Sequence, residues 1–313
     1  MNEGVAAAEP TWKRVVKFPL VAMVLAILIY ALGGTAGALI DKAIPLRGTN
    51  LSAALKTAIL VVCFVLAYKV GIRKLGEVPR DDLVVSRKTM KELALGLLVG
   101  LVIFSAVVGT AALFHVYRII GQGDASQLVI ALAATAVIPG LTEELLFRGI
   151  LFRWLEEFGG SWFGLAASSL LFGFAHYFNP QSTVIACLWI AVEAGILLGG
   201  VYMLTRNLWM AMGVHAAWNF TQGEIFDIPV SGLDSHGLVE AQLSGPPLLS
   251  GGAFGLEASV IALVIATAAG LWFVWLAARR GNIVRPWWVR RRLAREATVP
   301  HDDVTVPSVP REA

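Results

Sequence analysis

The stretch PGLTEELLFRG, residues 139–149, places three ionisable side chains inside a very apolar part of the chain. Glu144 and Arg148 are four residues apart with the acid first, the favourable spacing and order for an ion pair along a helix. Glu143 projects about 100° away from Glu144 on the same helix, so it is free to face the interior of a bundle. Ionisable groups near the centre of a membrane each cost at least about 2.5–3.5 kcal/mol, and they usually face a partner or a water-filled cavity.

Three more polar side chains follow within apolar sequence: His176, His215 and Asn219. His215 and Asn219 share one helix face at i,i+4 spacing, and Phe172 lies one turn before His176. The polar side chains are therefore concentrated in the middle of the chain.

Counting along the helices predicts that these groups lie at one depth. Glu143 and His176 are each sixteen to seventeen residues from the centre of the Gly159–Gly160 turn, so they should lie level in antiparallel helices. His215 lies nine residues from Arg206, a basic residue expected at the membrane surface. We therefore expect side chains from three helices to meet near the middle of the membrane.

Such a set could activate water. A carboxylate in an apolar pocket is well suited to act as a general base, so Glu143 could take a proton from water, with His176 sharing or orienting that water. His215 and Asn219 could donate hydrogen bonds to a developing oxyanion, worth about 3–4 kcal/mol for one donor. The adjacent Glu144–Arg148 pair would hold the helix and keep the local field near neutral.

Other chemistries use the same residues. Glu143, His176 and His215 could bind zinc with one open coordination position; no HExxH sequence is present, so no cofactor is the preferred reading. A non-enzymatic membrane scaffold or an immunity-type binding protein is the rival hypothesis. A weaker one is a proton-coupled transporter with Glu143 and His176 as a relay, but no inverted repeat supports it.

The composition indicates which elements must position these residues. Soluble domains carry about 25% charged residues, whereas this chain of 313 residues carries 15% and is 57% hydrophobic, with a mean hydropathy of +0.71. Cys63 and Cys187 lie in apolar segments and are expected to be core residues rather than a disulfide. The predicted fold class is all-α, a polytopic membrane bundle of about eight transmembrane helices, and Pro139-Gly140 should kink or break the fourth. The predicted helices are 18–40, 51–70, 92–114, 126–155, 162–178, 183–204, 207–221 and 254–278.

Basic residues predict the orientation in the membrane. Segment 71–91 contains six Lys or Arg and segment 279–295 contains seven Arg, whereas loop 222–253 contains none. The positive-inside rule therefore places both termini in the cytoplasm, and the pattern suits the plasma membrane of a prokaryote. A net charge of +3 is too small to suggest nucleic acid as a partner.

The expected organisation is a cytoplasmic tail (1–17), three helices with a basic loop (18–125), a polar catalytic core (126–221), an extracytoplasmic loop (222–253), a last helix (254–278) and a basic, then disordered, cytoplasmic tail (279–313).

Glu193 lies in the middle of the sixth predicted helix. It comes two residues before Gly195, which begins a Gly-x-x-x-Gly packing motif that ends at Gly199. The carboxylate could hydrogen-bond a neighbouring helix or line the same cavity as the polar set, and we expect the structural role.

The sequences EELLFR, FGFAH and HAAWN resemble the EExxxR, FxxxH and HxxxN motifs of the CPBP family, the CAAX proteases and bacteriocin-processing enzymes. The resemblance covers about residues 126–221. It implies an intramembrane endopeptidase that cuts a membrane-associated peptide or protein, through a glutamate and without metal in the CAAX branch. It also implies that Glu143 and His176 activate water and that His215 and Asn219 form the oxyanion site; prenylation of the substrate is not indicated. The supporting motif positions are Glu144, Arg148 and Phe172.

Overall fold

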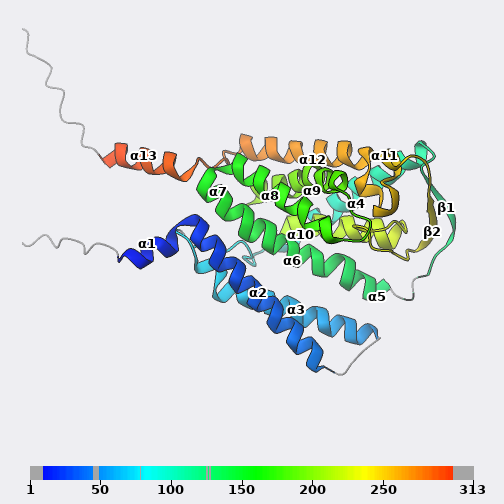
Figure 1. Cartoon of the computed structure of the whole chain (residues 1–313), viewed down its shortest axis with the longest axis horizontal. Coiled ribbons are helices and arrows are strands. Elements are labelled where there is room, and N and C mark those ends of the chain that lie inside the picture. The colour runs from blue at the N-terminus through cyan, green and yellow to red at the C-terminus, as the bar shows by residue number, and fades with distance from the viewer. Residues whose placement is uncertain (1–9, 45–48, 78, 125, 127, 299–313) are drawn as a thin grey trace, which may run out of the picture.

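Each of the eight stretches predicted to form a helix is helical in the computed structural model, which describes residues 10–44, 49–77, 79–124, 126 and 128–298 (Figure 1). The chain is therefore a multi-pass helical membrane protein, as its composition predicts. Most of the predicted disordered tail, from residue 299 onward, lies outside the described residues. The longer helices are α2 (Pro19–Ala43), α3 (Asn50–Val70), α4 (Thr89–Leu113), α6 (Ile138–Leu146), α8 (Ser161–Ala175), α9 (Val184–Thr205), α10 (Trp209–Phe220), α12 (Val260–Arg279) and α13 (Trp287–Thr298); the short ones are α1 (Thr11–Lys17), α5 (Leu128–Ala131), α7 (Arg153–Gly159) and α11 (Pro247–Ser250).

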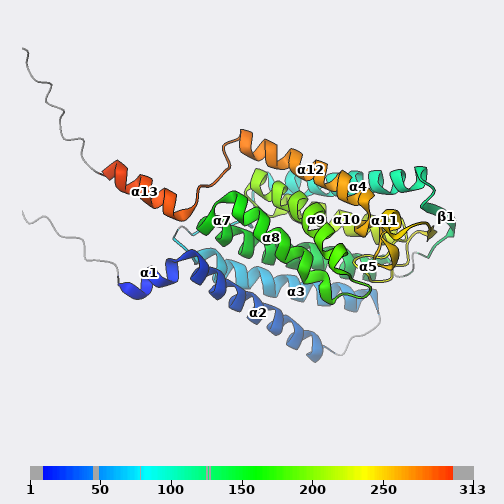
Figure 2. The same ribbon diagram turned by 45° about the horizontal axis from the view of Figure 1, so that its top comes forward.

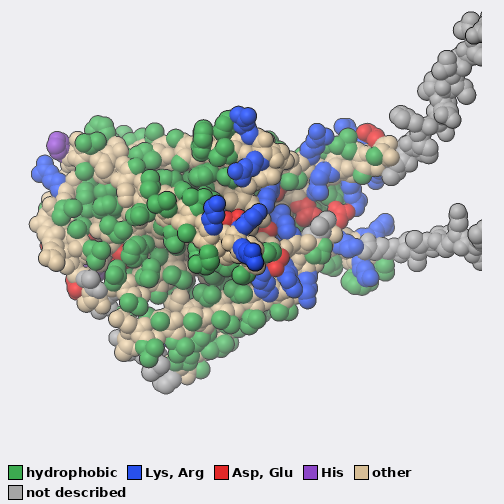
Figure 3. Space-filling view, turned by 180° about the vertical axis from the view of Figure 1, so that it is seen from behind, with side chains coloured by type: hydrophobic (Ala, Val, Ile, Leu, Met, Phe, Trp, Pro, Cys, Tyr) green, Lys and Arg blue, Asp and Glu red, His purple; other side chains and the backbone are tan. Residues whose placement is uncertain are grey.

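The helices are arranged around α8, α9 and α10. The α2–α3 hairpin lies along one side, and α12 and α4 lie on the other (Figures 1 and 2). α10 packs along α4, and α9 packs between α8 and α12. Apolar side chains cover much of the face of this body that Figure 3 shows, as contact with lipid tails requires.

Not every helix has the length of a membrane span. Six helical segments within the described ranges are long and apolar enough to cross a membrane: α2, α3 with the short turn η1 (Ile72–Lys74), α4, residues 128–159, α9 and α12. α8 and α10 have 15 and 12 residues, fewer than the roughly 20 needed for a span. Short turns continue both of them, η4 (His176–Phe178) after α8 and η5 (Thr221–Ile225) after α10.

Residues 128–159 form one unbroken helical segment, so of the kink or break predicted at Pro139-Gly140 the break does not occur. Two π-helical stretches, η2 (Leu132–Val137) and η3 (Phe147–Phe152), interrupt the α-helical pattern on either side of α6. Pro139 has no N–H, so it cannot donate to the carbonyl of Thr135 four residues earlier. The π-helical stretch η2 ends two residues before the proline and changes the hydrogen-bond pattern there.

A small two-stranded sheet lies at the end of the molecule away from the termini (Figure 1), and the sequence patterns do not predict it. β1 (Tyr117–Gln122) pairs antiparallel with β2 (Val239–Leu243), which lies within the predicted loop 222–253. The Tyr117 hydroxyl donates to the carbonyl of Phe226 at 3.1 Å. The loop is therefore folded back onto the bundle near the ends of α8 and α10.

Lys and Arg side chains gather at the opposite end of the molecule. On the face shown in Figure 3 most of them lie where both termini leave the body. The two arginine- and lysine-rich segments of the sequence, 71–91 and 279–295, belong to this end.

Glycines allow α4 and α10 to approach closely. A Cβ on Gly100 of α4 would lie 2.4 Å from the carbonyl oxygen of Val214 and 2.9 Å from Cβ of Ala217, both on α10. Helices can approach this closely only where side chains are small. Because α10 carries His215 and Asn219, this packing sets where both side chains lie.

Gly100→Ala is therefore expected to destabilise the protein by about 1–3 kcal/mol, because the added methyl must push α10 away. Gly109→Ala on the same helix is the matched control, since its Cβ would meet nothing within 4 Å. Thermal unfolding of both variants in detergent measures the difference. Equal melting temperatures for the two variants would contradict the close contact at Gly100.

Candidate active site

Arg148, Glu144 and His215 form a buried polar chain across two helical segments. Nη1 of Arg148 lies 2.7 Å from Oε1 of Glu144, and the two side chains are 1% and 0% exposed. Nη2 of Arg148 also donates to the carbonyl of Ala194 at 3.3 Å, and its guanidinium lies over the ring of Phe172 at 4.6 Å. The ion pair predicted from the i,i+4 spacing is present, and α9 and α8 hold the arginine in place.

Glu144 also contacts His215, which the sequence spacing does not predict. Oε1 of Glu144 lies 2.8 Å from Nδ1 of His215. Because a carboxylate paired with arginine can only accept, Nδ1 must carry the hydrogen of this bond. The other ring nitrogen, Nε2, then faces Glu143, whose Oε2 lies 3.9 Å away.

Glu143 is the most accessible of the charged motif residues. Its side chain is 32% exposed, yet its Oε2 is buried and has no hydrogen-bond partner within the described part of the chain. A buried carboxylate oxygen with no protein partner needs a water molecule or another ligand to satisfy it. α2 reaches this region too, because the Tyr30 hydroxyl donates to the carbonyl of Thr142 at 3.2 Å.

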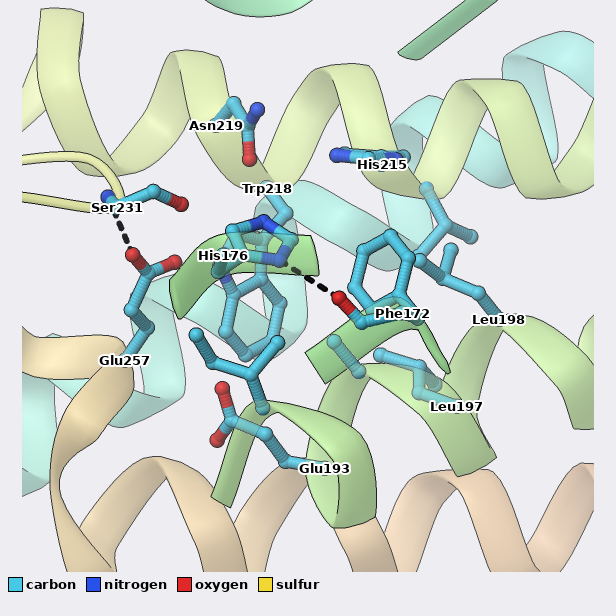
Figure 4. A pocket seen from close by; sticks show the side chains of 13 residues that line it. Phe172, His176, Glu193, Leu197, Leu198, His215, Trp218, Asn219, Ser231 and Glu257 are labelled. Atoms are coloured by element: carbon cyan, nitrogen blue, oxygen red, sulfur yellow. Dashed lines mark hydrogen bonds between the residues drawn. The ribbon is translucent and has the colours of Figure 1, made fainter. Parts of the chain in front are cut away.

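His176 and Glu143, which the sequence predicts to lie at one depth, are not bonded to each other directly. Across the residues that the structure describes, no hydrogen bond or ion pair joins the two side chains. Nδ1 of His176 instead lies 2.8 Å from the carbonyl oxygen of Phe172, one turn earlier (Figure 4). The Phe172 ring lies between the histidines, with centroids 5.0 Å from His176 and 5.9 Å from His215. Residues four apart lie one turn apart on the same helix face, so the imidazole of His176 reaches the Phe172 carbonyl. α8 ends here, and its last carbonyls have no donor within the helix.

Asn219 donates a hydrogen bond to the backbone carbonyl that lies four residues before Pro139. Its Nδ2 donates to the carbonyl of Thr135 at 2.8 Å, the oxygen that has lost its helical donor. The Thr135 hydroxyl lies 2.8 Å from the carbonyl of Ala131 and 3.2 Å from Oε1 of Glu224. One N–H of Asn219 therefore links α10 to η2, and the second N–H remains for another acceptor.

The histidines and Asn219 lie on the wall of a small internal cavity (Figure 4). About 30 Å³ of it is open to the centre of a water molecule, enough for one or two waters. Three polar residues that the motifs do not include also line it: Glu193, Ser231 and Glu257. The sequence left two roles open for Glu193, a hydrogen bond to a neighbouring helix or a place on the cavity wall; its carboxylate lines the cavity, and its Oε2 has no hydrogen-bond partner among the described residues.

Glu257 was missed because the predicted last helix was placed too early, and Ser231 because it lies in the predicted loop 222–253, which has no helical periodicity. That helix was expected from residue 254, which would have carried Glu257 in its first turn at the membrane surface. α12 instead begins at Val260, and Glu257 lies in a preceding 3₁₀ turn, η7 (Leu256–Ala258), which folds back to the cavity. An acidic residue beside the glycines Gly251, Gly252 and Gly255 was the only sequence signal.

The zinc alternative requires three ligands in one place. Among the described residues, no group of three His, Cys, Asp or Glu side chains lies close enough to hold a metal ion. Nδ1 of each histidine is engaged, in His176 by the Phe172 carbonyl and in His215 by Glu144, and each Nε2 is left free of hydrogen bonds with the described residues, as in many metal-binding histidines. It is the spacing of the side chains that argues against Glu143, His176 and His215 as a ligand set in this arrangement.

The fold defines a multi-pass helical membrane protein whose polar side chains converge at a buried site. Residues 125–221 match the family described as Rce1-like, the type II CAAX prenyl endopeptidase Rce1-like proteins. This match confirms the family that the three motifs predict and supports a protease. No curated protein and no solved structure matches the chain.

Proposed function

We propose that this protein is an intramembrane endopeptidase in which Glu143 activates a water molecule to hydrolyse a peptide bond. The observation that carries the proposal is the buried chain from Arg148 through Glu144 to His215, which directs Nε2 of His215 towards the unpartnered Oε2 of Glu143 at 3.9 Å. A structural ion pair would not need the histidine, and a scaffold would not need a free carboxylate oxygen beside it.

Each side chain has a distinct part in the proposed reaction. Glu143 takes a proton from the water molecule while the water oxygen attacks the carbonyl carbon of the peptide bond. This proton then passes to the leaving amine. Glu144, held in place by Arg148, fixes the ring orientation of His215, so that Nε2 rather than Nδ1 faces the reacting atoms. His215 in its protonated form and the second N–H of Asn219 are the donors available to the oxyanion.

The role of His176 differs from the one that the motifs imply. Its Nδ1 contacts the Phe172 carbonyl at 2.8 Å, so only Nε2 is available to the substrate or to water. We assign His176 to the wall of the cavity that it lines together with His215 and Asn219, where its Nε2 would orient the substrate.

The substrate in this proposal is a membrane-associated protein or peptide. The protein would lie in the plasma membrane of a prokaryote, with both termini and the basic end of Figure 3 in the cytoplasm. The site then lies below a surface covered with apolar side chains, which suits a substrate held in the bilayer.

Mass spectrometry of new protein termini tests the function. Membranes that contain the protein are compared with membranes of the same cells that lack it. New termini that appear only with the protein would establish proteolysis and identify substrates. An identical set of termini, in cells where the protein has a measurable phenotype, would favour the non-enzymatic scaffold.

Removal of metal is expected to leave cleavage unchanged, because the water is activated by Glu143 in this mechanism. Purified protein is treated with 1,10-phenanthroline, and the cleavage rate of an identified substrate is compared with that of untreated protein. A non-chelating phenanthroline isomer controls for effects of the compound itself. Loss of activity that returns on addition of zinc would overturn the metal-free mechanism.

A further inference from the structure

The cavity beside His215 and Asn219 has a second polar wall that the proposed reaction does not use. Glu193 in α9 and Glu257 in η7 both line it, although they are distant in the sequence (Figure 4). The two residues are 1% and 5% exposed. The wall therefore carries two buried carboxylates from two separate elements.

Helix geometry accounts for the direction of Glu193. Gly195 packs against α8, since a Cβ there would lie 2.5 Å from Cβ of Ser169. Glu193 is two residues earlier, about 200° round the helix, so it faces away from that contact. Its Oε2 has no hydrogen-bond partner within the described ranges. A buried carboxylate oxygen of this kind is costly unless a ligand or water satisfies it.

Glu257 is held in place by the backbone around it. The backbone N–H of Ser231 donates a short hydrogen bond to its Oε1. Gly255 has φ of +116°, and a Cβ there would lie 2.0 Å from the carbonyl oxygen of Pro229, so only glycine fits. Burial raises the pKa of the Glu257 carboxyl, opposed by the charge of His176 and the bond from Ser231. A cation bound beside it would favour the ionised form.

The rest of the lining consists of the polar residues His176, His215, Asn219 and Ser231 and of apolar side chains, among them Ile190, Leu197 and the indole of Trp218; no lysine or arginine is among the lining residues. Two buried carboxylates with no lysine or arginine in the lining complement a positive charge, and the apolar side chains complement an aliphatic chain that carries it. Trp218 offers an aromatic ring for a cation–π contact.

We propose that Glu193 and Glu257 form a subsite for a lysine side chain of the peptide substrate, close to the bond that is cut. This inference rests on the proposed proteolytic function, because it names a side chain of the substrate that the same site would select. The free space of about 30 Å³ holds one or two water-sized groups, which suits a primary ammonium better than a guanidinium.

Direct binding tests the subsite without any cleavage. Thermal unfolding of the purified full-length protein is followed with n-butylammonium chloride as the probe, and with butan-1-ol or sodium chloride at the same concentration as controls. We expect the ammonium compound alone to raise the melting temperature. The variant Glu193→Gln/Glu257→Gln should lose this shift, with an apparent affinity at least about ten-fold lower. An equal shift in both proteins, or the same shift with sodium chloride, would overturn the proposal.

The termini of cleaved proteins provide the second test. Among termini that depend on Glu143, we expect lysine at one fixed position relative to the cut. The double variant should cleave these sites about 100-fold more slowly, while Glu240→Gln, an exposed carboxylate on β2, should not change the preference. Glu143-dependent termini with no lysine preference would refute the subsite alone. An absence of Glu143-dependent termini would refute the proteolytic function, and the binding measurement would still decide whether the cavity takes an amine.

Discussion

Glu143→Gln is expected to lower the rate of cleavage by about 10²- to 10⁴-fold, the usual contribution of a general base. Glutamine keeps the size and the hydrogen-bonding capacity of the side chain but cannot accept the proton from water. The side chain is 32% exposed and makes no ion pair closer than 3.9 Å, so folding should change little. The rate is measured on a substrate identified from new termini, with purified protein at equal concentration.

The outcome separates catalysis from binding. A catalytic base should affect kcat and kcat/KM together, with KM nearly unchanged. Thermal unfolding of the variant in detergent should match that of the original protein and of the surface control Glu240→Gln. Cleavage within about three-fold of the original rate would show that another group activates the water.

Arg148→Ala is expected to destabilise the protein by about 3–5 kcal/mol, the usual effect of removing one partner of a buried ion pair. Glu144 is fully buried, so its charge would be left with only His215 as a partner. The variant should express poorly or unfold at a clearly lower temperature. Cleavage should fall as well, because Glu144 no longer has the arginine that holds it in place beside His215.

Two further variants separate the effect of the unpaired charge on stability from the effect of the lost packing. Glu144→Gln/Arg148→Met removes both charges and keeps most of the volume, so it should recover a large part of the stability. Arg291→Ala removes an exposed pair with Glu77, and such surface changes stay within about 0.5 kcal/mol. Normal expression and normal thermal stability of Arg148→Ala would contradict the supporting role of the buried pair.

Asn219 shows how one side chain can have both a structural and a chemical task. It satisfies the Thr135 carbonyl that Pro139 leaves without a helical donor. The proline in helix 128–159 therefore positions a candidate oxyanion donor on α10 rather than breaking the helix. A variant at Asn219 should change stability as well as activity, which distinguishes it from Glu143.

The relations that the sequence predicts correctly are those within one helix. The Glu144–Arg148 pair and the proximity of Phe172 to His176 follow from i,i+4 spacing, which backbone hydrogen bonding imposes on any α-helix. The apolar stretches predict the helices themselves for the same reason, because in a bilayer a spanning segment must satisfy its own backbone groups. Three short motifs then indicate the family.

The relations between helices required the tertiary structure. The bond from His215 to Glu144 depends on how far α10 is rotated and how closely it approaches its neighbours, which small residues such as Gly100 decide. The sequence predicts equal depth for Glu143 and His176, but equal depth does not determine which way a side chain points, and no hydrogen bond joins the two among the described residues. The pairing of β1 with β2 and the return of Glu257 to the cavity join residues far apart in the chain. No local periodicity encodes such contacts, so the sequence determined which groups are present and their order along each helix, and packing alone decided which of them meet.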